Sequence, residues 1–350
     1  MNHRAEWLSY VVSAVPGACI ALAAGAGFIE ENTALVILSI SFVGLNVAHM
    51  AATWSRVFLD PTYVRGAMLE RAWVPAILAL GPILGEAVGY GAVLLGAQYY
   101  LSLHHAMMQS YGLPRSAQRR SGRILSPFSL RVDQAACLFL PLGAFLYRAH
   151  AVCHTYSSAK LLAPPLWLAV VFAAVGIVAL IAHVSREVIA HGRGESVDPL
   201  GPAVVLSQVF LWTALPLVVD HPGIPLYALA SSHYVQYLHF VWKSENSRPG
   251  LVFVPSWLRD RIAPPSKIAY VVALTAFGGF GVVILTLLSI LARAAADASG
   301  MRPATALPIA PWVAAMIGVN FSHYWLDHRI WRFRPAASNA TSNAPLPQAT

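Results

Sequence analysis

Four histidines lie in separate apolar segments, each in or beside a row of polar side chains at helical spacing. At about 100° per residue, positions three or four apart share one helix face. The rows are Asn46, His49, Thr53 and Arg56; Gln98, Ser102, His105 and Gln109; Ser232, Gln236, His239 and Lys243, with His233 beside them; and Asn320, His323 and Asp327. Polar groups that face lipid are costly, so we expect each row to face protein, water or a bound ion.

Imidazoles gathered at one depth of a helical bundle favour a metal site. Neutral imidazole suits iron, zinc, copper and nickel, and histidine is the commonest metal ligand. The predicted ligands are His49, His105, His233 and His323, with His239 as a reserve ligand or as a group that orients one. Carboxylates are scarce in these segments, and Asp327 is the best placed of them. This donor set disfavours a carboxylate-rich di-iron site and favours a mostly histidine one.

Three polar residues beside these histidines are candidates for catalytic roles. Gln236 is expected to orient an imidazole, because groups around a metal site usually hydrogen-bond to its ligands. Asp327 is expected to do the same or to serve as a reserve ligand, and Arg56 to hold a polar group or a counter-charge. A redox-active metal at membrane depth suits the oxidation of a lipid-soluble substrate.

The remaining polar and aromatic side chains fit structural roles better. A single buried histidine is usually a hydrogen-bonded core residue, and this is our expectation for His104. We place His183 near the lipid headgroups. His150 and His154 have the spacing of a metal pair, but the topology below puts them on the opposite side of the membrane. We expect most of five aromatic residues to form an interfacial belt, and the alternative for some of them is the lining of a cavity for a flat or polyene substrate. They are Tyr237, Trp242, Tyr324, Trp325 and Trp331.

The composition is that of a multi-pass membrane protein. Of 350 residues, 57% are hydrophobic and 11% charged, which excludes an ordinary soluble domain. The three cysteines show no CxxC spacing, so they indicate neither a disulfide framework nor a cysteine metal site. The net charge of +8 does not indicate nucleic-acid binding, because the basic residues lie between apolar spans, where membrane orientation explains them.

Ten apolar segments predict ten transmembrane helices in an all-α bundle. The expected spans are 7–29, 34–57, 73–85, 87–110, 132–152, 164–186, 201–219, 222–243, 268–292 and 310–330. With both termini cytoplasmic, all of the 23 Lys and Arg residues except Arg148, Lys160, Arg293 and Arg302 fall on the cytoplasmic side, as the positive-inside rule requires. We expect one transmembrane domain over 1–334 and a disordered cytoplasmic tail over 335–350.

Two stretches resemble a known family. His239-Phe240-Val241-Trp242-Lys243, preceded by His233, and His323-Tyr324-Trp325-Leu326-Asp327, followed by Ile330-Trp331-Arg332, are similar to the bacterial and archaeal β-carotene dioxygenases of the Brp/Blh type. The resemblance implies a multi-helix protein of the bacterial cytoplasmic membrane that holds non-haem Fe(II) through histidines and cleaves a carotenoid with O₂. Here His233 and His239 are six residues apart, whereas the family's paired histidines are four apart. Another lipophilic substrate is therefore an equal alternative.

Two other functions remain open at this stage. The same polar rows suit a transporter or proton pathway with a histidine-lined cavity. Histidines on separate helices also suit haem binding, or a structural role in a larger membrane complex. The chain contains no convincing P-loop, GxSxG, HExxH or Rossmann motif, so the corresponding enzyme classes receive no support.

Overall fold

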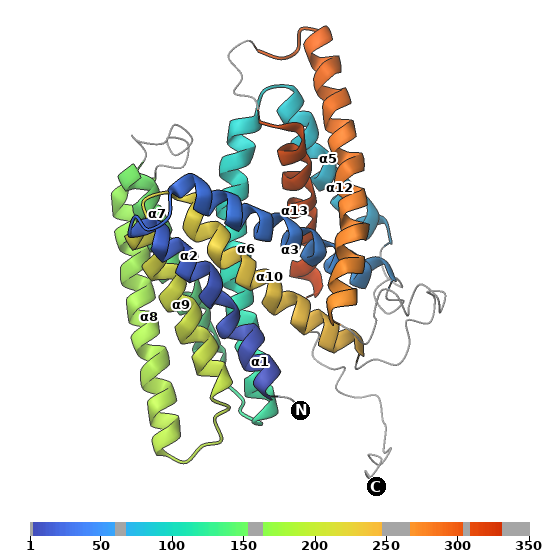
Figure 1. The fold of residues 1–350 in the computed structure, drawn as a ribbon. Helices are drawn as coiled ribbons and strands as arrows, with labels where there is room; N and C mark the ends of the chain where they lie inside the picture. Colours follow the sequence, from blue (N-terminus) through green and yellow to red (C-terminus); the bar gives the residue numbers. More distant parts are fainter. Residues whose placement is uncertain (1–2, 60–67, 153–163, 247–266, 304–308, 331–350) are drawn as a thin grey trace, which may run out of the picture.

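The computed structural model describes residues 3–59, 68–152, 164–246, 267–303 and 309–330, and within these ranges the chain is helical and has no strand (Figure 1). The helices are α1 (His3–Tyr10), the 3₁₀ turn η1 (Val12–Ala14), α2 (Val15–Gly25), α3 (Glu31–Leu59), α5 (Met68–Ala87), α6 (Gly91–Arg120), α7 (Pro127–Val152), α8 (Leu166–Gly192), α9 (Leu200–Val218), α10 (Gly223–Asn246), α12 (Lys267–Ala298) and α13 (Pro311–Ile330). Each predicted apolar segment is largely helical, and the first, 7–29, is divided among α1, η1 and α2. The all-α prediction is therefore confirmed.

Several helices are long and apolar enough to cross a membrane. In the described part of the chain these are Arg4–Gly25, Glu31–Trp54, Pro127–Val152, Leu166–Gly192, Leu200–Val218 and Ile268–Ala298. Trp73–Ala87 is apolar but shorter. The helices α6, α10 and α13 fall outside this set because their polar side chains lower their hydropathy, whereas α3 remains in the set although it carries His49. A multi-pass membrane protein follows, whereas the count of ten spans and the side of each terminus stay predictions.

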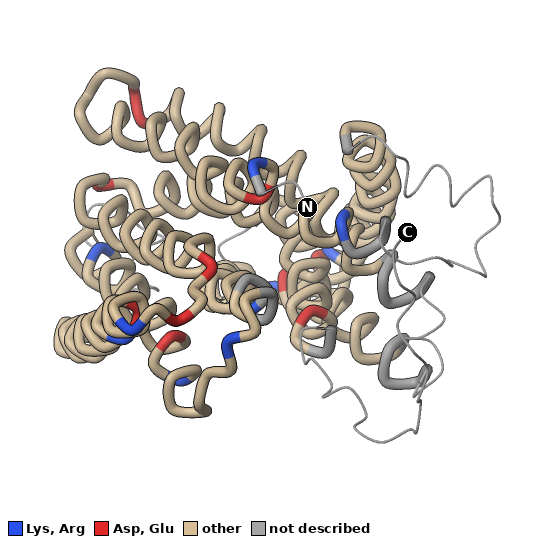
Figure 2. The backbone as a smooth tube through the Cα atoms, turned by 90° about the horizontal axis from the view of Figure 1, so that it is seen from below, with Lys and Arg blue, Asp and Glu red and all other residues tan. Residues whose placement is uncertain are grey.

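The outward faces of α8 and α12 are apolar. On α12, Phe280 and Leu291 are 68% and 65% exposed, and on α8 Val178 is 68% exposed. Charged residues are sparse along the described chain (Figure 2), and α9 contains none. Extended apolar surface of this kind is rare on soluble monomers and is expected where a helix faces lipid.

The site helices cross one another obliquely. Figure 1 shows α3 and α10 slanting across the molecule, while α6, α12 and α13 run closer to its long direction. Small residues allow the close contact between α3 and α10, because Ala48 and Ala52 of α3 are buried against Tyr237 and Val241 of α10. As a result, one turn of each helix meets the others near a common point.

Two glycines set how closely the site helices pack. A Cβ atom on Gly318 of α13 would lie 2.1 Å from the Ala79 carbonyl oxygen of α5. A Cβ atom on Gly278 of α12 would lie 2.7 Å from the Val47 carbonyl oxygen of α3. These separations are too short for any side chain, so the backbones approach directly, as at small-residue contacts in membrane bundles. Gly318 lies five residues before His323 and therefore helps to set the depth of that histidine.

A buried arginine closes the far end of α9. The Arg148 guanidinium of α7 donates to the carbonyl oxygens of Pro216 (2.6 Å) and Leu217 (2.5 Å) and to the Asp220 carboxylate (2.6 Å). Helix-terminal carbonyl groups lack partners within their own helix, so a cation there satisfies them and the helix dipole together.

Candidate metal centre

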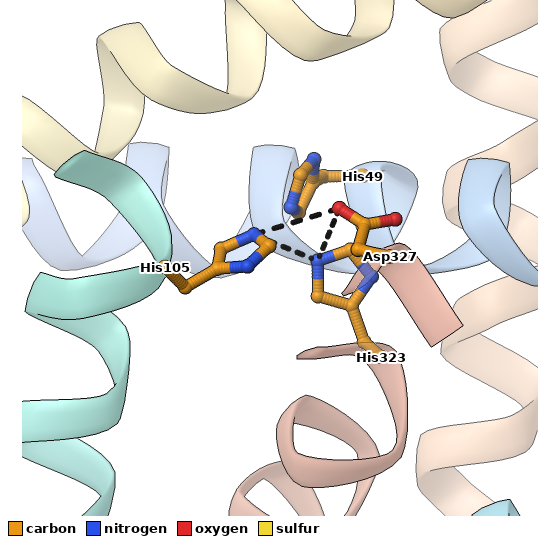
Figure 3. Close-up of side chains that lie close together, drawn as sticks. All are labelled: His49, His105, His323 and Asp327. Atoms are coloured by element: carbon orange, nitrogen blue, oxygen red, sulfur yellow. Dashed lines mark hydrogen bonds and ion pairs between the residues drawn. The ribbon is translucent and has the colours of Figure 1, made fainter. Parts of the chain in front are cut away.

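His49 of α3, His105 of α6, and His323 and Asp327 of α13 point toward one another (Figure 3). One ligand atom from each lies within 4.8 Å of the others. His105 Nε2 and His323 Nε2 are 3.2 Å apart, and each lies 3.6 Å from Asp327 Oδ2. Three segments distant in sequence thus contribute three imidazoles and one carboxylate to a single buried group, which we call the His₃Asp group.

Two hydroxyl groups orient the Asp327 carboxylate. Its Oδ1 accepts hydrogen bonds from Thr53 Oγ1 and from the Tyr237 hydroxyl, both at 2.8 Å. The two hydroxyl oxygens are themselves 2.6 Å apart. With Oδ1 held in this way, Oδ2 faces the imidazoles of His105 and His323. Ligating carboxylates are commonly held by such outer hydrogen bonds.

His233 of α10 lies at the edge of the His₃Asp group. Its ring centroid is 5.0 Å from that of His49 and 5.0 Å from that of His105. Among the described residues, neither ring nitrogen of His49 or His233 has a hydrogen-bond partner, although both side chains are buried. Because a neutral imidazole has one donor and one acceptor, such nitrogens call for an explanation, and a bound ion is one.

His105 is held by an aromatic neighbour. The Tyr324 ring stacks on it at 4.5 Å between centroids and 29° between planes. The Tyr324 hydroxyl in turn contacts Gln98 and Ser102 of α6. The stacking fixes the plane of His105 and with it the direction of its nitrogens.

The separations among His105, His323 and Asp327 fit a single ion, and a ligand atom of His49 lies within 4.8 Å of theirs. Ligand atoms about 2.1 Å from an ion and spread at 90–110° lie about 3.0–3.4 Å apart. The distances of 3.2 and 3.6 Å in the His₃Asp group are within a few tenths of an ångström of that range. The imidazoles bind a divalent ion as neutral ligands, and the carboxylate neutralises part of its charge. A bound ion would in turn offset the cost of burying the Asp327 carboxylate. The residues present therefore fit a metal such as Fe(II) or Zn(II).

Two predicted residues of α10 lie elsewhere. Gln236 donates to the Tyr10 carbonyl oxygen of α1 at 2.9 Å, and its amide oxygen is 3.5 Å from Gln109 Nε2. His239 packs against the rings of Tyr10 and Trp242. Six residues of helix separate His239 from His233 by about 120°, so only one of the two can face the group. We expected Gln236 and His239 beside the metal ligands, but in the structure both contact Tyr10 instead.

Arg56 and the remaining histidines lie outside the His₃Asp group or outside the described residues. Arg56 belongs to α3, but its side chain lies outside the described residues, as does His154. His104 is exposed, and His150 Nδ1 lies 3.1 Å from the Pro164 carbonyl oxygen. His183 is not at a polar surface but buried, with Nδ1 2.7 Å from Asp133. Its position follows from the close pairing of α7 and α8, which apolar periodicity alone does not reveal.

The aromatic-belt expectation is wrong for Tyr237. It is fully buried and bonded to Asp327, and Tyr324 stacks on His105 rather than lying in an outer belt. A sequence signal for both existed, since Tyr237 follows His233 by four residues, and Tyr324 follows Asn320 by four and precedes Asp327 by three. Their membership of rows that contain histidines predicts the same inward direction.

Comparisons with protein-family models, curated proteins and solved structures found no match to this chain.

Proposed function

We propose that this chain is an integral-membrane, metal-dependent oxidoreductase that acts on a lipophilic substrate and uses Fe(II) and O₂. The main support for the proposal is the His₃Asp group, a set of nitrogen and oxygen donors within 4.8 Å of one another on three helices of a multi-pass membrane protein. Two imidazoles and one carboxylate are the donor set of many non-haem Fe(II) oxygenases.

The roles of the chain's own residues follow from their positions. The ion would be held by His49, His105, His323 and Asp327. His233, at the edge of the His₃Asp group, would be a further ligand. Iron held by these residues would supply the redox chemistry for a reaction with O₂. Thr53 and Tyr237 keep the carboxylate aimed at the site, and the surrounding apolar helices keep water out.

The membrane setting supports a lipophilic substrate. The exposed faces of α8 and α12 are apolar, so a molecule dissolved in the bilayer has direct access to the surface of the protein. The carotenoid implied by the family resemblance is one such molecule, and the bacterial cytoplasmic membrane is the location we propose with it.

A bare ion is favoured over haem by the arrangement of the ligand atoms. Haem leaves two axial positions on opposite faces of its iron, because the macrocycle occupies the other four. In this protein four donor atoms cluster round one point, and two of them are only 3.2 Å apart.

Metal analysis with a visible spectrum tests the proposal. We expect the protein, purified in detergent and loaded anaerobically with Fe(II), to hold about one iron per chain and to show no Soret band. The variants His323→Ala and Asp327→Ala should lose the iron. His104→Ala, an exposed residue of the same helix as His105, serves as the matched control. A Soret band, or wild-type protein that binds no metal after loading, would reject the proposal.

A further inference from the structure

Beside His105, three polar side chains form a closed triangle between α6 and α13. Gln98 Nε2 donates to Ser102 Oγ at 2.8 Å and to the Tyr324 hydroxyl at 3.0 Å. The Ser102 and Tyr324 hydroxyl oxygens are 2.8 Å apart. The triangle joins the polar row of α6 to the ring that stacks on His105.

The hydrogen bonds of this triangle do not use all of its donors and acceptors. Gln98 has two amide hydrogens, and both are engaged. One hydroxyl hydrogen serves the contact between Ser102 and Tyr324, so the other hydroxyl hydrogen is left over. Gln98 Oε1 is buried and has no hydrogen-bond partner among the described residues. One hydroxyl donor and one amide acceptor thus remain unused within the triangle, and a ligand hydroxyl group can pair with both kinds of group.

The side chains of the triangle are more exposed than the most buried ligands of the His₃Asp group. The His105 side chain is 13% exposed, whereas those of Asp327 and His323 are 2% and 0% exposed. Gln98, Ser102 and Tyr324 are each partly exposed, and Leu101 on the same side of α6 is 43% exposed. A molecule that comes from the lipid therefore meets this strip of α6 before it meets the buried ligands.

We propose that the triangle of Gln98, Ser102 and Tyr324 binds the hydroxyl group of a lipophilic alcohol. Ser102 precedes His105 by three residues, so the bound oxygen lies about one helical turn, roughly 5 Å along the axis, from the level of His105. The hydrocarbon chain then lies along α6, past His105. The place of this alcohol as a substrate rests on the proposed function, but its binding requires no metal.

Binding of two matched probes tests the assignment. The probes are a tritiated C20 isoprenoid alcohol and the tritiated hydrocarbon that lacks its hydroxyl group, measured by scintillation proximity on protein in lipid nanodiscs, with and without Fe(II). We expect the alcohol to bind about tenfold more tightly than the hydrocarbon, the effect of one or two net hydrogen bonds. Tyr324→Phe, which keeps the stacked ring, and Gln98→Leu should reduce this preference to about twofold or less. Both variants should retain the wild-type iron content.

Gln134→Leu provides the matched control, because Gln134 of α7 contacts Met108 and takes no part in the triangle. This variant should keep the full preference for the alcohol. Equal binding of the two probes to wild-type protein, no saturable binding of the alcohol, or an unchanged preference in both triangle variants would overturn the assignment. Wild-type protein that binds no iron yet prefers the alcohol would support the triangle and reject the proposed function, so the two proposals fail separately.

Discussion

The hydroxyl pair behind Asp327 leads to a specific prediction about metal affinity. Three contacts join Thr53 Oγ1, the Tyr237 hydroxyl and Asp327 Oδ1, at 2.6, 2.8 and 2.8 Å. Only two hydroxyl hydrogens are available for these three contacts. When one hydroxyl group is removed, the other can therefore donate to Oδ1 without competition and keep the carboxylate in place.

The expected losses follow from this count. Groups that hydrogen-bond to a metal ligand typically contribute 10- to 100-fold in metal affinity, which is about 1.4–2.7 kcal/mol. We expect the double variant Thr53→Val/Tyr237→Phe to show a loss in this range. Each single variant should lose less than about threefold, because one donor to Oδ1 remains. The loss in the double variant should thus exceed the sum of the single losses, as a double-mutant cycle reveals.

The assay is anaerobic titration of purified protein with Co(II) or Fe(II) against a competing chelator. Tyr99→Phe and Thr275→Val are the matched controls. Tyr99 has a buried hydroxyl group with no hydrogen-bond partner among the described residues, and Thr275 bonds the Val271 carbonyl oxygen of its own helix. If Tyr237→Phe alone caused the entire loss of metal affinity, Thr53 would not replace the missing hydrogen bond to Asp327 Oδ1, and the reasoning from two shared hydroxyl hydrogens would be wrong. If the double variant bound metal as tightly as wild type, Asp327 would not be a ligand.

Three further predictions concern other parts of the molecule. His239→Ala should keep its iron, because His239 packs against Tyr10 away from the His₃Asp group, and iron loss in metal analysis would contradict this placement. Gly318→Ala should lower the stability of the protein by about 1–3 kcal/mol in thermal unfolding, because the added Cβ atom would collide with α5. Gly281 has open space around it, so the control variant Gly281→Ala should change the stability little. Arg148→Met should lower the thermal midpoint through loss of the bonds to the end of α9, with unchanged iron content, and an unchanged midpoint would mean that these bonds contribute nothing.

The helices and the inward direction of the histidine rows could be predicted from the sequence. Apolar runs of spanning length predict helices because a backbone in lipid must satisfy its hydrogen bonds internally. A polar side chain in such a run must turn away from lipid, so the spacing of Asn46, His49 and Thr53 was sufficient to predict one inward face. The structure places His49, His105 and His323 beside one another, in agreement with that reasoning, while their role as ligands stays a prediction.

The tertiary structure decided which polar residues of a row reach the common point. On α10, the sequence offered His233 as a predicted ligand and His239 as a reserve. In the structure α1 packs against one side of α10, where its Tyr10 contacts Gln236 and His239. Asp327 became a member of the group because Thr53 and Tyr237, from two other helices, hold its carboxylate there.

Periodicity determines the relative angles of side chains on one helix, and it does so locally, through the helical repeat of about 3.6 residues. The rotation of each helix about its axis, its depth and its crossing angle depend on contacts between segments far apart in the chain. Gly318 against Ala79 and Ala48 against α10 are such contacts. For this protein the sequence by itself determined the helices and their polar faces, and only packing between helices determined where those faces meet.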